Sequence, residues 1–348
     1  MQINLSLKTL HFKKPARTSR GEYTEHRMIV ITMMDEKGQR IGLGECAPLP
    51  DLSSDRDAYR RMSDVANLIN KALASDDYSE FLRPYPALLF ALESAMYDYQ
   101  HNPLLYDTPF ARSEVGIPIN GLVWMSDYDD MLRQVKQKML QGFRCIKLKI
   151  GAISWDEEIR LIEKIRSRFS KDTIQLRVDA NCAFSLEEAM PKLKQLARYD
   201  IHSIEQPIKT GQWKELAKLC RESPLPIALD EELIGLNQLH EKQVMLDTVR
   251  PQYIVVKPTL HGGMSGSMEW ISEAQKRGIG SWITSALESN IGLRNVALLA
   301  ARIYGTKADG TPQLMMPQGL GTGLLFTDNI EMDIEIRGSK LWRCEVDE

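Results

Sequence analysis

The sequence predicts an α/β fold, in which a small α+β domain precedes a closed parallel barrel of alternating strands and helices. From about residue 115 onward, short runs rich in β-branched residues alternate with helical patterns. Charged residues end five of these runs at steps of 30, 26, 25 and 27 positions, at Lys149, Asp179, Glu205, Asp230 and Lys257. One strand, one helix and two short loops need about that many residues, and the active site of such a barrel lies where its strands end.

The bulk composition indicates a soluble enzyme of the cytoplasm. The 348 residues are 43% hydrophobic and 26% charged, and the net charge of −3 argues against a nucleic-acid partner. We expect no membrane partner, because no apolar run reaches the length of a span and the N-terminus lacks a signal-peptide pattern. The five scattered cysteines indicate reduced thiols. Nothing in the composition indicates an oligomeric state.

Residues 1–112 form the predicted α+β domain, because they do not follow the strand–helix alternation. The expected elements are strands at 3–12, 27–34 and 41–46, with helices at about 55–76 and 87–101. The sequence Asp35-Glu36-Lys37-Gly38 predicts the turn between the second and third strands.

Residues 113–325 form the predicted barrel. Its eight expected strands are Ile117–Trp124, Cys145–Ile150, Ile174–Asp179, Ser203–Glu205, Ile227–Asp230, Tyr253–Lys257, Trp282–Ser285 and Leu314–Met316. Helices are expected between them, among others at 126–141, 156–169, 185–199 and 267–277. Ser154 and Ser185 stand at N-cap positions, and Gly142 and Gly278 stand where helices end. The last segment, 326–348, is strand-like and is expected to return to the first domain.

Three acidic residues that end successive strands predict a metal site. Adjacent strands lie about 4.8 Å apart, so Asp179, Glu205 and Asp230 can converge on one ion. Three carboxylates held together repel one another unless a cation lies between them. All-oxygen ligands favour Mg²⁺, with Mn²⁺ as the alternative. One such aspartate alone would more often be a helix cap, but three at matched strand ends favour the metal.

Lysines are expected on two sides of these acids. Lys147 and Lys149 lie two positions apart and therefore point to the same face of a strand, whereas Lys257 ends a strand across the barrel. Two adjacent ammonium groups and a nearby metal lower the pKa of a lysine, so one of the pair can act as a neutral base. The alternative is a solvated lysine pair at a strand edge, which a buried central strand disfavours.

This arrangement suits the removal of a proton α to a carboxylate. A divalent cation would bind the carboxylate and neutralise the enediolate as it forms, while a lysine takes the proton. The opposite side of the site would either return a proton, giving racemisation, or assist elimination. A chain with this fold but without metal ligands could also be non-enzymatic, which the complete set of acids and lysines argues against.

The motifs Lys-Leu-Lys, Arg-Val-Asp-Ala-Asn, Ile-Glu-Gln-Pro, Leu-Asp-Glu-Glu and Val-Val-Lys-Pro, in this order, resemble the muconate-lactonizing-enzyme subgroup of the enolase superfamily. The resemblance covers the whole chain. It implies a modified TIM barrel, (β/α)7β, with an N-terminal α+β capping domain. It also implies that Asp179, Glu205 and Asp230 bind Mg²⁺, and that Lys149 is the base with Lys147 as its electrostatic partner. Lys257 would face them across the site.

The segment after the expected eighth strand bears on the activity. Dipeptide epimerases carry Asp-x-Asp there to bind an α-ammonium group, whereas Met316–Gly323 contains no acid and offers backbone N–H groups to a carboxylate. The run Ser285–Gly292 is similar to a segment of o-succinylbenzoate synthases. The cap segment Gly44–Pro50, with Ser53 and Ser54, is similar to the loop that closes their site. The resemblance therefore implies a dehydratase of menaquinone biosynthesis that acts on a small carboxylate. N-acylamino acid racemase, dipeptide epimerase and muconate cycloisomerase are the alternatives.

Four residues are candidates for substrate binding and two for supporting the site. Arg177 shares a strand face with Asp179, and a salt bridge within the barrel is its alternative role. Ser285 and Gly319 belong to the segments named above. Arg20 lies in an expected mobile flap at 18–21, where an ordinary solvated arginine is the alternative. Asn181 and Glu231 are expected behind the metal ligands.

Overall fold

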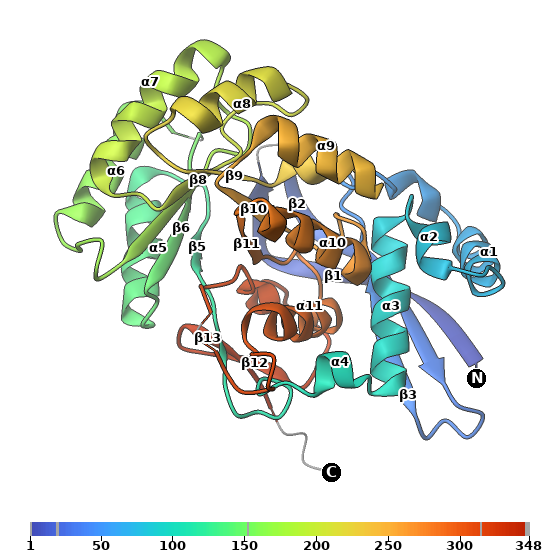
Figure 1. The fold of residues 1–348 in the computed structure, drawn as a ribbon. Helices are drawn as coiled ribbons and strands as arrows, with labels where there is room; N and C mark the ends of the chain where they lie inside the picture. The colour runs from blue at the N-terminus through green and yellow to red at the C-terminus, as the bar shows by residue number, and fades with distance from the viewer. Residues whose placement is uncertain (1, 19–20, 152, 314, 345–348) are drawn as a thin grey trace.

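Seven parallel strands form the largest sheet in the computed structural model, which describes residues 2–18, 21–151, 153–313 and 315–344 (Figure 1). Their order in space is their order along the chain. The strands are β5 (Gly121–Val123), β6 (Cys145–Lys149), β7 (Gln175–Asp179), β8 (Ser203–Glu205), β9 (Ile227–Leu229), β10 (Tyr253–Val256) and β11 (Gly280–Ile283). Helices cover the outside of the sheet, so its residues are largely apolar and buried.

The barrel closes at a different place from the one predicted for its eighth strand. Gln318 and Gly319 form parallel bridges to Ile119 and Thr284, on the two edges of the sheet, whereas Leu314–Met316 was expected. Leu314 itself lies outside the described residues. No side chain fits at Gly319, because a Cβ there would lie 1.9 Å from Thr284 Oγ1. Gln318 instead buries its side-chain amide, which accepts a hydrogen bond from Ile283 N at 2.7 Å.

The first predicted strand, Ile117–Trp124, is two strands in the structure. Its beginning, β4 (Ile117–Pro118), pairs with β13 (Lys340–Arg343), and only β5 joins the barrel. Pro118 has no N–H with which to continue a ladder, so the chain leaves one sheet and enters the next after it.

Helices fill the gaps between the barrel strands as expected. They are α5 (Tyr128–Leu140), α6 (Trp155–Arg166), α7 (Leu186–Leu196), α8 (Trp213–Glu222), α9 (Leu239–Val249), α10 (Gly263–Lys276) and α11 (Asn290–Tyr304). Short 3-10 turns lie at Ala197–Tyr199, Glu231–Leu233 and Thr322–Leu324. Ser154 and Ser185 each form a capping box, and Gly142 and Gly278 follow helix ends with φ of +84° and +70°, which confirms all four predictions.

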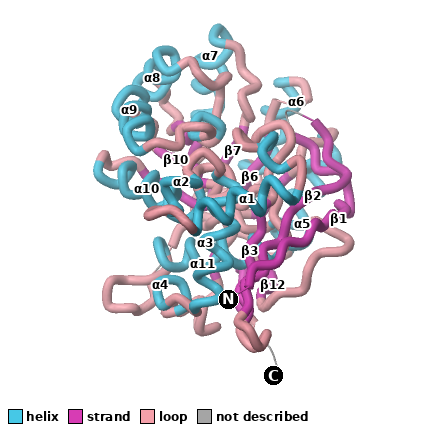
Figure 2. The backbone as a smooth tube through the Cα atoms, turned by 90° about the vertical axis from the view of Figure 1, so that its right-hand side faces the viewer, coloured by secondary structure: helices cyan, strands magenta, loops and turns pink. Residues whose placement is uncertain are grey.

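The cap contains the expected three-stranded antiparallel sheet and its helices. Its elements are β1 (Gln2–Thr18), β2 (Gly21–Met34), β3 (Ile41–Cys46), a 3-10 turn at Arg56–Tyr59, α1 (Met62–Leu73), α2 (Tyr78–Leu82), α3 (Pro86–Gln100) and α4 (Pro103–Tyr106). The helix predicted at 55–76 is divided, because Arg61 is extended at φ −132°. Figure 2 faces this side of the molecule, where α3 packs on the sheet around a separate apolar core.

The C-terminal segment contacts both parts of the molecule. Phe326 bridges Phe12 of β1, as a return to the cap requires. The following hairpin, β12 (Ile334–Arg337) and β13 (Lys340–Arg343), pairs with β4 and not with a cap strand. No helix in the described part of the chain is long and apolar enough to span a membrane.

Candidate active site

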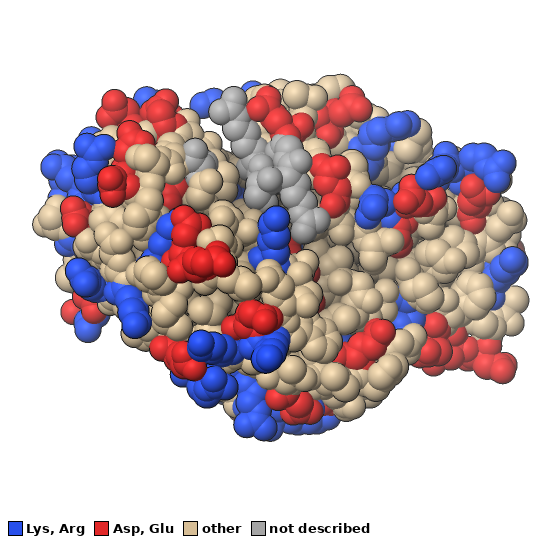
Figure 3. Space-filling model, turned by 90° about the horizontal axis from the view of Figure 1, so that it is seen from above, with Lys and Arg blue, Asp and Glu red and all other residues tan. Residues whose placement is uncertain are grey.

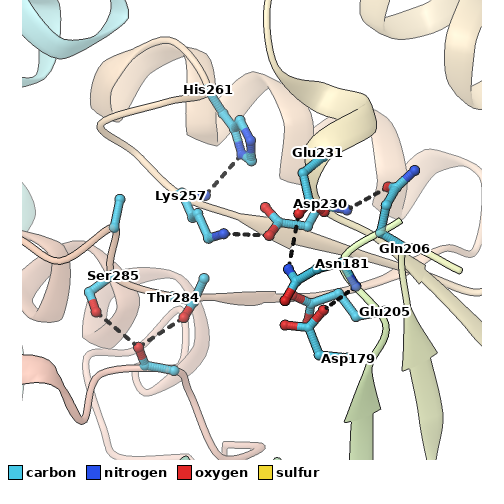
Figure 4. Close-up of polar contacts among 12 residues, drawn as sticks. Asp179, Asn181, Glu205, Gln206, Asp230, Glu231, Lys257, His261, Thr284 and Ser285 are labelled. Carbon is cyan, nitrogen blue, oxygen red and sulfur yellow. Dashed lines mark hydrogen bonds and ion pairs between the residues drawn. The ribbon is translucent and has the colours of Figure 1, made fainter. Parts of the chain in front are cut away.

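The parallel register places the predicted charged residues at one end of the barrel. Lys149 of β6 pairs with Asp179 of β7, which pairs with Glu205 of β8, so the three stand side by side. Asp230 follows β9 directly. The acids are 1%, 2% and 0% exposed, respectively, and their carboxylates point toward one another (Figure 4). Short β-branched strands that end at one level explain this convergence.

Two lysines form ion pairs with the three carboxylates. Lys147 Nζ lies 2.8 Å from Asp179 Oδ2 and 2.6 Å from Glu205 Oε1. On the opposite side, Lys257 forms a close ion pair with Asp230. The structure therefore brings the three predicted acids into contact with lysines from both sides of the barrel, as the spacing along the chain predicts.

Lys149 occupies a different environment from Lys147. Its Nζ donates to Asn181 Oδ1 at 2.7 Å and lies 3.5 Å from Asp179 Oδ2. Asn181 also donates from Nδ2 to Glu231 Oε1 at 3.0 Å, so the two predicted supporting residues form one chain of contacts. Asn181 has φ +42°, a left-handed conformation that asparagine tolerates better than most residues. Lys149 thus faces the cavity with a neutral hydrogen-bond partner at 2.7 Å and a carboxylate farther away, at 3.5 Å.

The pKa of Lys147 moves in the opposite direction from the one expected. Burial opposes its charge, but the carboxylates of Asp179, Glu205 and Asp230 outweigh burial and raise the pKa. Repulsion between lysines was expected to lower it. At Lys147 the carboxylates outweigh this repulsion, because Asp179 and Glu205 contact the ammonium group and Asp230 adds its charge.

The acid cluster fits a divalent cation by its charge and its oxygen atoms. Burial and the charge of Asp179 raise the pKa of Glu205, so the lysines do not fully compensate the negative charge. Asp230 Oδ1 and Glu231 Oε2 are buried and have no hydrogen-bond partner among the described residues. Within that part of the chain, no three acidic, histidine or cysteine side chains already form a metal-binding arrangement. Lys147 and Lys257 instead form ion pairs with the carboxylates.

A cavity of about 120 Å³ opens beside Lys149. Its lining comprises Tyr23, Leu49 and Leu52 of the cap, together with Asn120, Leu122, Trp124, Lys147, Lys149, Asp179, Asn181, Glu231, Lys257, Thr284, Ser285, Ala286, Leu287, Gly319, Gly321 and Thr322 of the barrel. A second cavity, of about 950 Å³, shares Asn120, Leu122, Trp124, Gly321 and Thr322 with it. Because the two cavities share lining residues, together they can hold a larger ligand than the first cavity could hold alone.

Two predicted substrate contacts, Ser285 and Gly319, line this cavity, but both polar groups are engaged. The Ser285 hydroxyl lies 2.7 Å from Thr322 Oγ1, and the Gly319 N–H donates to the Ile283 carbonyl at 2.8 Å. The expectation of an available N–H was therefore wrong at Gly319, since barrel closure uses it.

Arg177 does not line the cavity, in contrast to its predicted role. Its guanidinium is buried inside the barrel, 4.2 Å from the Trp282 ring, and donates to the Pro317 carbonyl at 3.1 Å. Nε and Nη2 have no partner among the described residues, so the alternative of a salt bridge is also absent in that part of the chain. Arg20 lies outside the described residues.

Apart from those in the segments Gly44–Pro50 and Ser285–Gly292, the aromatic and apolar residues of the cavity had no predicted role. Trp124 follows β5, and its ring lies 6.0 Å from Lys149 Nζ. Trp124 ends a predicted barrel strand, and active-site residues are expected at such strand ends, so the same rule that identified the acids could have identified it. Tyr23 and Leu52 come from the cap, and nothing local in the sequence places them over the barrel.

Comparisons with known proteins agree with this architecture. The family model described as enolase C-terminal domain-like matches residues 130–324. The o-succinylbenzoate synthase of Desulfotalea psychrophila is 39% identical, over 98% of each chain. The N-succinylamino acid racemase of Thermus thermophilus is 29% identical, over 83% of this chain and 79% of its own.

Solved structures share the fold. The crystal structure of MenC from Desulfotalea psychrophila has a TM-score of 0.78 at 36% identity, over 98% of this chain and 99% of that one. The L-Ala-D/L-Glu epimerase from Bacillus subtilis, at 20% identity and a TM-score of 0.80, covers 96% of its own chain and 99% of this one. The fold is thus a modified TIM barrel with a capping domain, and the chain belongs to the enolase superfamily and, within it, to the o-succinylbenzoate synthase family.

Proposed function

We propose that this protein is an o-succinylbenzoate synthase, a lyase of menaquinone biosynthesis. It would catalyse the Mg²⁺-dependent syn-dehydration of 2-succinyl-6-hydroxy-2,4-cyclohexadiene-1-carboxylate to 2-succinylbenzoate. The observation that carries the proposal is the placement of Lys149 and Lys257 on opposite sides of three buried carboxylates. Membership of the family supports the choice of substrate.

Asp179, Glu205 and Asp230 are the residues that would hold the cation, with Mn²⁺ as a substitute for Mg²⁺. Members of the enolase superfamily generally use a divalent metal. When bound, the ion supplies positive charge that orients the substrate carboxylate and stabilises the negative charge that develops on it. Asn181 and Glu231 would hold the neighbouring acids in place.

Lys149 would carry out both proton transfers. As the neutral amine, it removes the proton from the ring carbon that bears the carboxylate, and negative charge develops on that carboxylate. The resulting ammonium group donates the same proton to the hydroxyl group on the adjacent carbon. The C–O bond breaks, water leaves from the same face, and the ring becomes aromatic. Lys147 stays charged and offsets part of the negative charge of Asp179 and Glu205.

Lys257 would act as a cation and not as an acid. Its pair with Asp230 holds it on the side of the cavity opposite to Lys149, where it can lie over the ring of the substrate. The walls around Ser285 and Gly319 would receive the succinyl tail. Arg177 is too deep in the barrel for direct contact, and binding of a carboxylate by Arg20 stays a prediction. The cytoplasmic location also stays a prediction.

Racemisation of N-succinyl amino acids is the second candidate. Lys149 and Lys257 face the same cavity from opposite sides, which is the arrangement that exchange of an α-proton between two faces requires. An epimerase of dipeptides is disfavoured, since Met316–Gly323 has no acid to bind an ammonium group.

One assay distinguishes these activities. The purified protein is incubated with the dehydratase substrate and, separately, with N-succinyl amino acids in deuterium oxide, each with and without EDTA. We expect rapid, EDTA-sensitive formation of 2-succinylbenzoate. Deuterium incorporation into N-succinyl amino acids without dehydration would favour the racemase, and dehydration that is unchanged by EDTA would refute the metal-dependent mechanism.

A further inference from the structure

Two buried carboxylates outside the acid cluster hold one wall of the cavity. This wall is the loop between β11 and α11, at residues 284–289, of which Thr284 through Leu287 line the cavity. Glu288 belongs to the loop itself, whereas Glu45 comes from β3 of the cap. Both are 0% exposed, and neither forms an ion pair with a lysine or arginine of the described residues.

Glu288 binds the loop to itself and to the neighbouring strand end. Its Oε2 accepts from Ala286 N at 2.6 Å, and its Oε1 accepts from Thr259 Oγ1 at 2.5 Å. Thr259 lies two positions after Lys257. Between Ala286 and Glu288, Leu287 has φ +68°, a strained conformation for leucine that persists only where the surroundings impose it. The carboxylate of Glu288 therefore keeps the wall in an otherwise unfavourable shape.

Glu45 binds the same loop to the cap. Its Oε1 accepts from Ser289 N at 2.9 Å, and its Oε2 accepts from Gly292 N at 2.8 Å and from the Ser289 hydroxyl. The carboxylate thus lies at the N-terminus of α11, whose dipole favours a negative charge. Glu45 is four residues before Leu49, which lines the cavity from the cap and shares an apolar cluster with Leu287.

We propose that Glu45 is a positioning residue, which aligns the cap with the β11–α11 loop and so sets the width of the substrate cavity. It does not touch the reacting atoms; it acts through Ser289 on Ala286 and Leu287, and through its own strand on Leu49. This inference rests on the proposed function for its kinetic effect, because the wall that it positions would contact the succinyl tail.

The chain contains a matched control for this role. Glu93 of α3 is also a cap carboxylate, 1% exposed, and accepts from Met264 N at 2.6 Å and Ser265 N at 3.2 Å at the start of α10. Glu93 therefore joins the cap to the barrel by the same chemistry, and α3 lies beside α10 (Figure 1). However, neither Met264 nor Ser265 belongs to the described cavity lining.

The test compares Glu45→Gln with Glu93→Gln. Glutamine keeps the shape but replaces one acceptor by a donor, which cannot bind the backbone N–H groups. We expect both variants to lose similar thermal stability. Glu45→Gln should raise KM for the dehydratase substrate about tenfold with kcat changed less than about threefold, whereas Glu93→Gln keeps KM within about twofold. An unchanged KM in Glu45→Gln, or an equal rise in both variants, would overturn the proposal.

Two further measurements keep the result decisive. Ser289→Ala removes the hydroxyl contact with Glu45 and the cap on Ile291 N, but it keeps the bond from the Ser289 N–H to Glu45. It should raise KM about threefold if Glu45→Gln does not fold; no rise would refute the role. Hydrogen–deuterium exchange requires no substrate. Glu45→Gln should speed the exchange of the amides at 286–292, and Glu93→Gln should not. If wild-type protein lacks dehydratase activity, the proposed function fails, and exchange at 286–292 alone decides the inference.

Discussion

Lys147 and Lys149 show how two identical residues on one strand face can differ in chemistry. The former lies between two carboxylates, so its positive charge is stabilised, whereas the latter contacts the neutral amide of Asn181. Lys149 also lies 3.5 Å from Asp179 Oδ2, a longer ion pair than the two that hold Lys147. This difference between their neighbouring side chains is consistent with the division of roles that the family resemblance implies.

Removal of the Lys149 amine tests its assignment as base. Lys149→Ala should lower kcat for dehydration by about 10²–10⁴-fold, the usual contribution of a positioned general base. Metal binding, measured by calorimetric titration, should stay within a few-fold of wild type. Lys218→Ala, at an exposed position of α8, is the control. Substantial remaining turnover in Lys149→Ala would remove the residue from this role.

Loss of the Asp230 carboxylate tests the metal site. Asp230→Ala should weaken Mg²⁺ binding at least about tenfold, since it removes one of three anionic ligands and leaves Lys257 without its pair. The measurement is a Mg²⁺ titration of activity and of binding heat. Asp247→Ala, which changes an exposed acid on α9, should leave the titration unchanged. An identical titration for Asp230→Ala would exclude it as a ligand.

At the scale of elements, the close packing of β3 on α3 explains why the cap needs glycine at Gly44. A Cβ at this position would lie 1.8 Å from the Ala91 carbonyl oxygen, so the strand and the helix approach backbone to backbone. The same contact brings Glu45, the next residue, to the N-terminus of α11. The glycine that lets β3 pack closely on α3 therefore also helps to place Glu45, which holds the cavity wall.

Gly44→Ala should destabilise the protein by about 3 kcal/mol or more, because the methyl group meets backbone that cannot move aside. Gly38→Ala is the comparison: it has φ +69° and open space around it, so only the left-handed conformation costs about 1 kcal/mol. Urea unfolding measures both. Equal losses for the two variants would show that α3 and β3 can separate to admit the methyl group.

At the scale of the whole molecule, buried carboxylates of the cap dock on the helices of the barrel. Desolvation raises the pKa of Glu45 and of Glu93 to about 7 in each case. The charged surface elsewhere is mixed, with acidic and basic side chains interspersed over the face in Figure 3. We therefore expect the stability of the contact between cap and barrel to change with pH mainly through Glu45 and Glu93.

The sign of this dependence follows from the raised pKa values. A carboxyl group whose pKa is higher in the folded state than its ordinary 4.5 stabilises the fold below about pH 4.5, and this contribution is lost as the pH rises through 7. Glu93→Gln should therefore lose less stability than wild type between pH 5 and 8, by on the order of 2–3 kcal/mol. Urea unfolding at both pH values measures the difference; an unchanged difference would refute the raised pKa.

The amino-acid sequence by itself determined the barrel, its helix caps and the charged residues at its strand ends. These features are local: a β-branched run ends at a charge, a serine begins a helix and a glycine ends one. The order of the motifs then identified the superfamily. Because the parallel strands lie side by side in chain order, residues that end successive strands meet at one end of the sheet. The acids and lysines therefore lie together as predicted.

Only the tertiary structure decided where the barrel closes, what the cap contributes and which polar groups remain available. Gln318–Gly319 closes the barrel through backbone contacts that need no apolar pattern, and Arg177 lies below the cavity against Trp282. Glu45 acts on residues more than 240 positions away. Contacts between such distant segments depend on how the cap docks on the barrel, and no local pattern in the sequence encodes that.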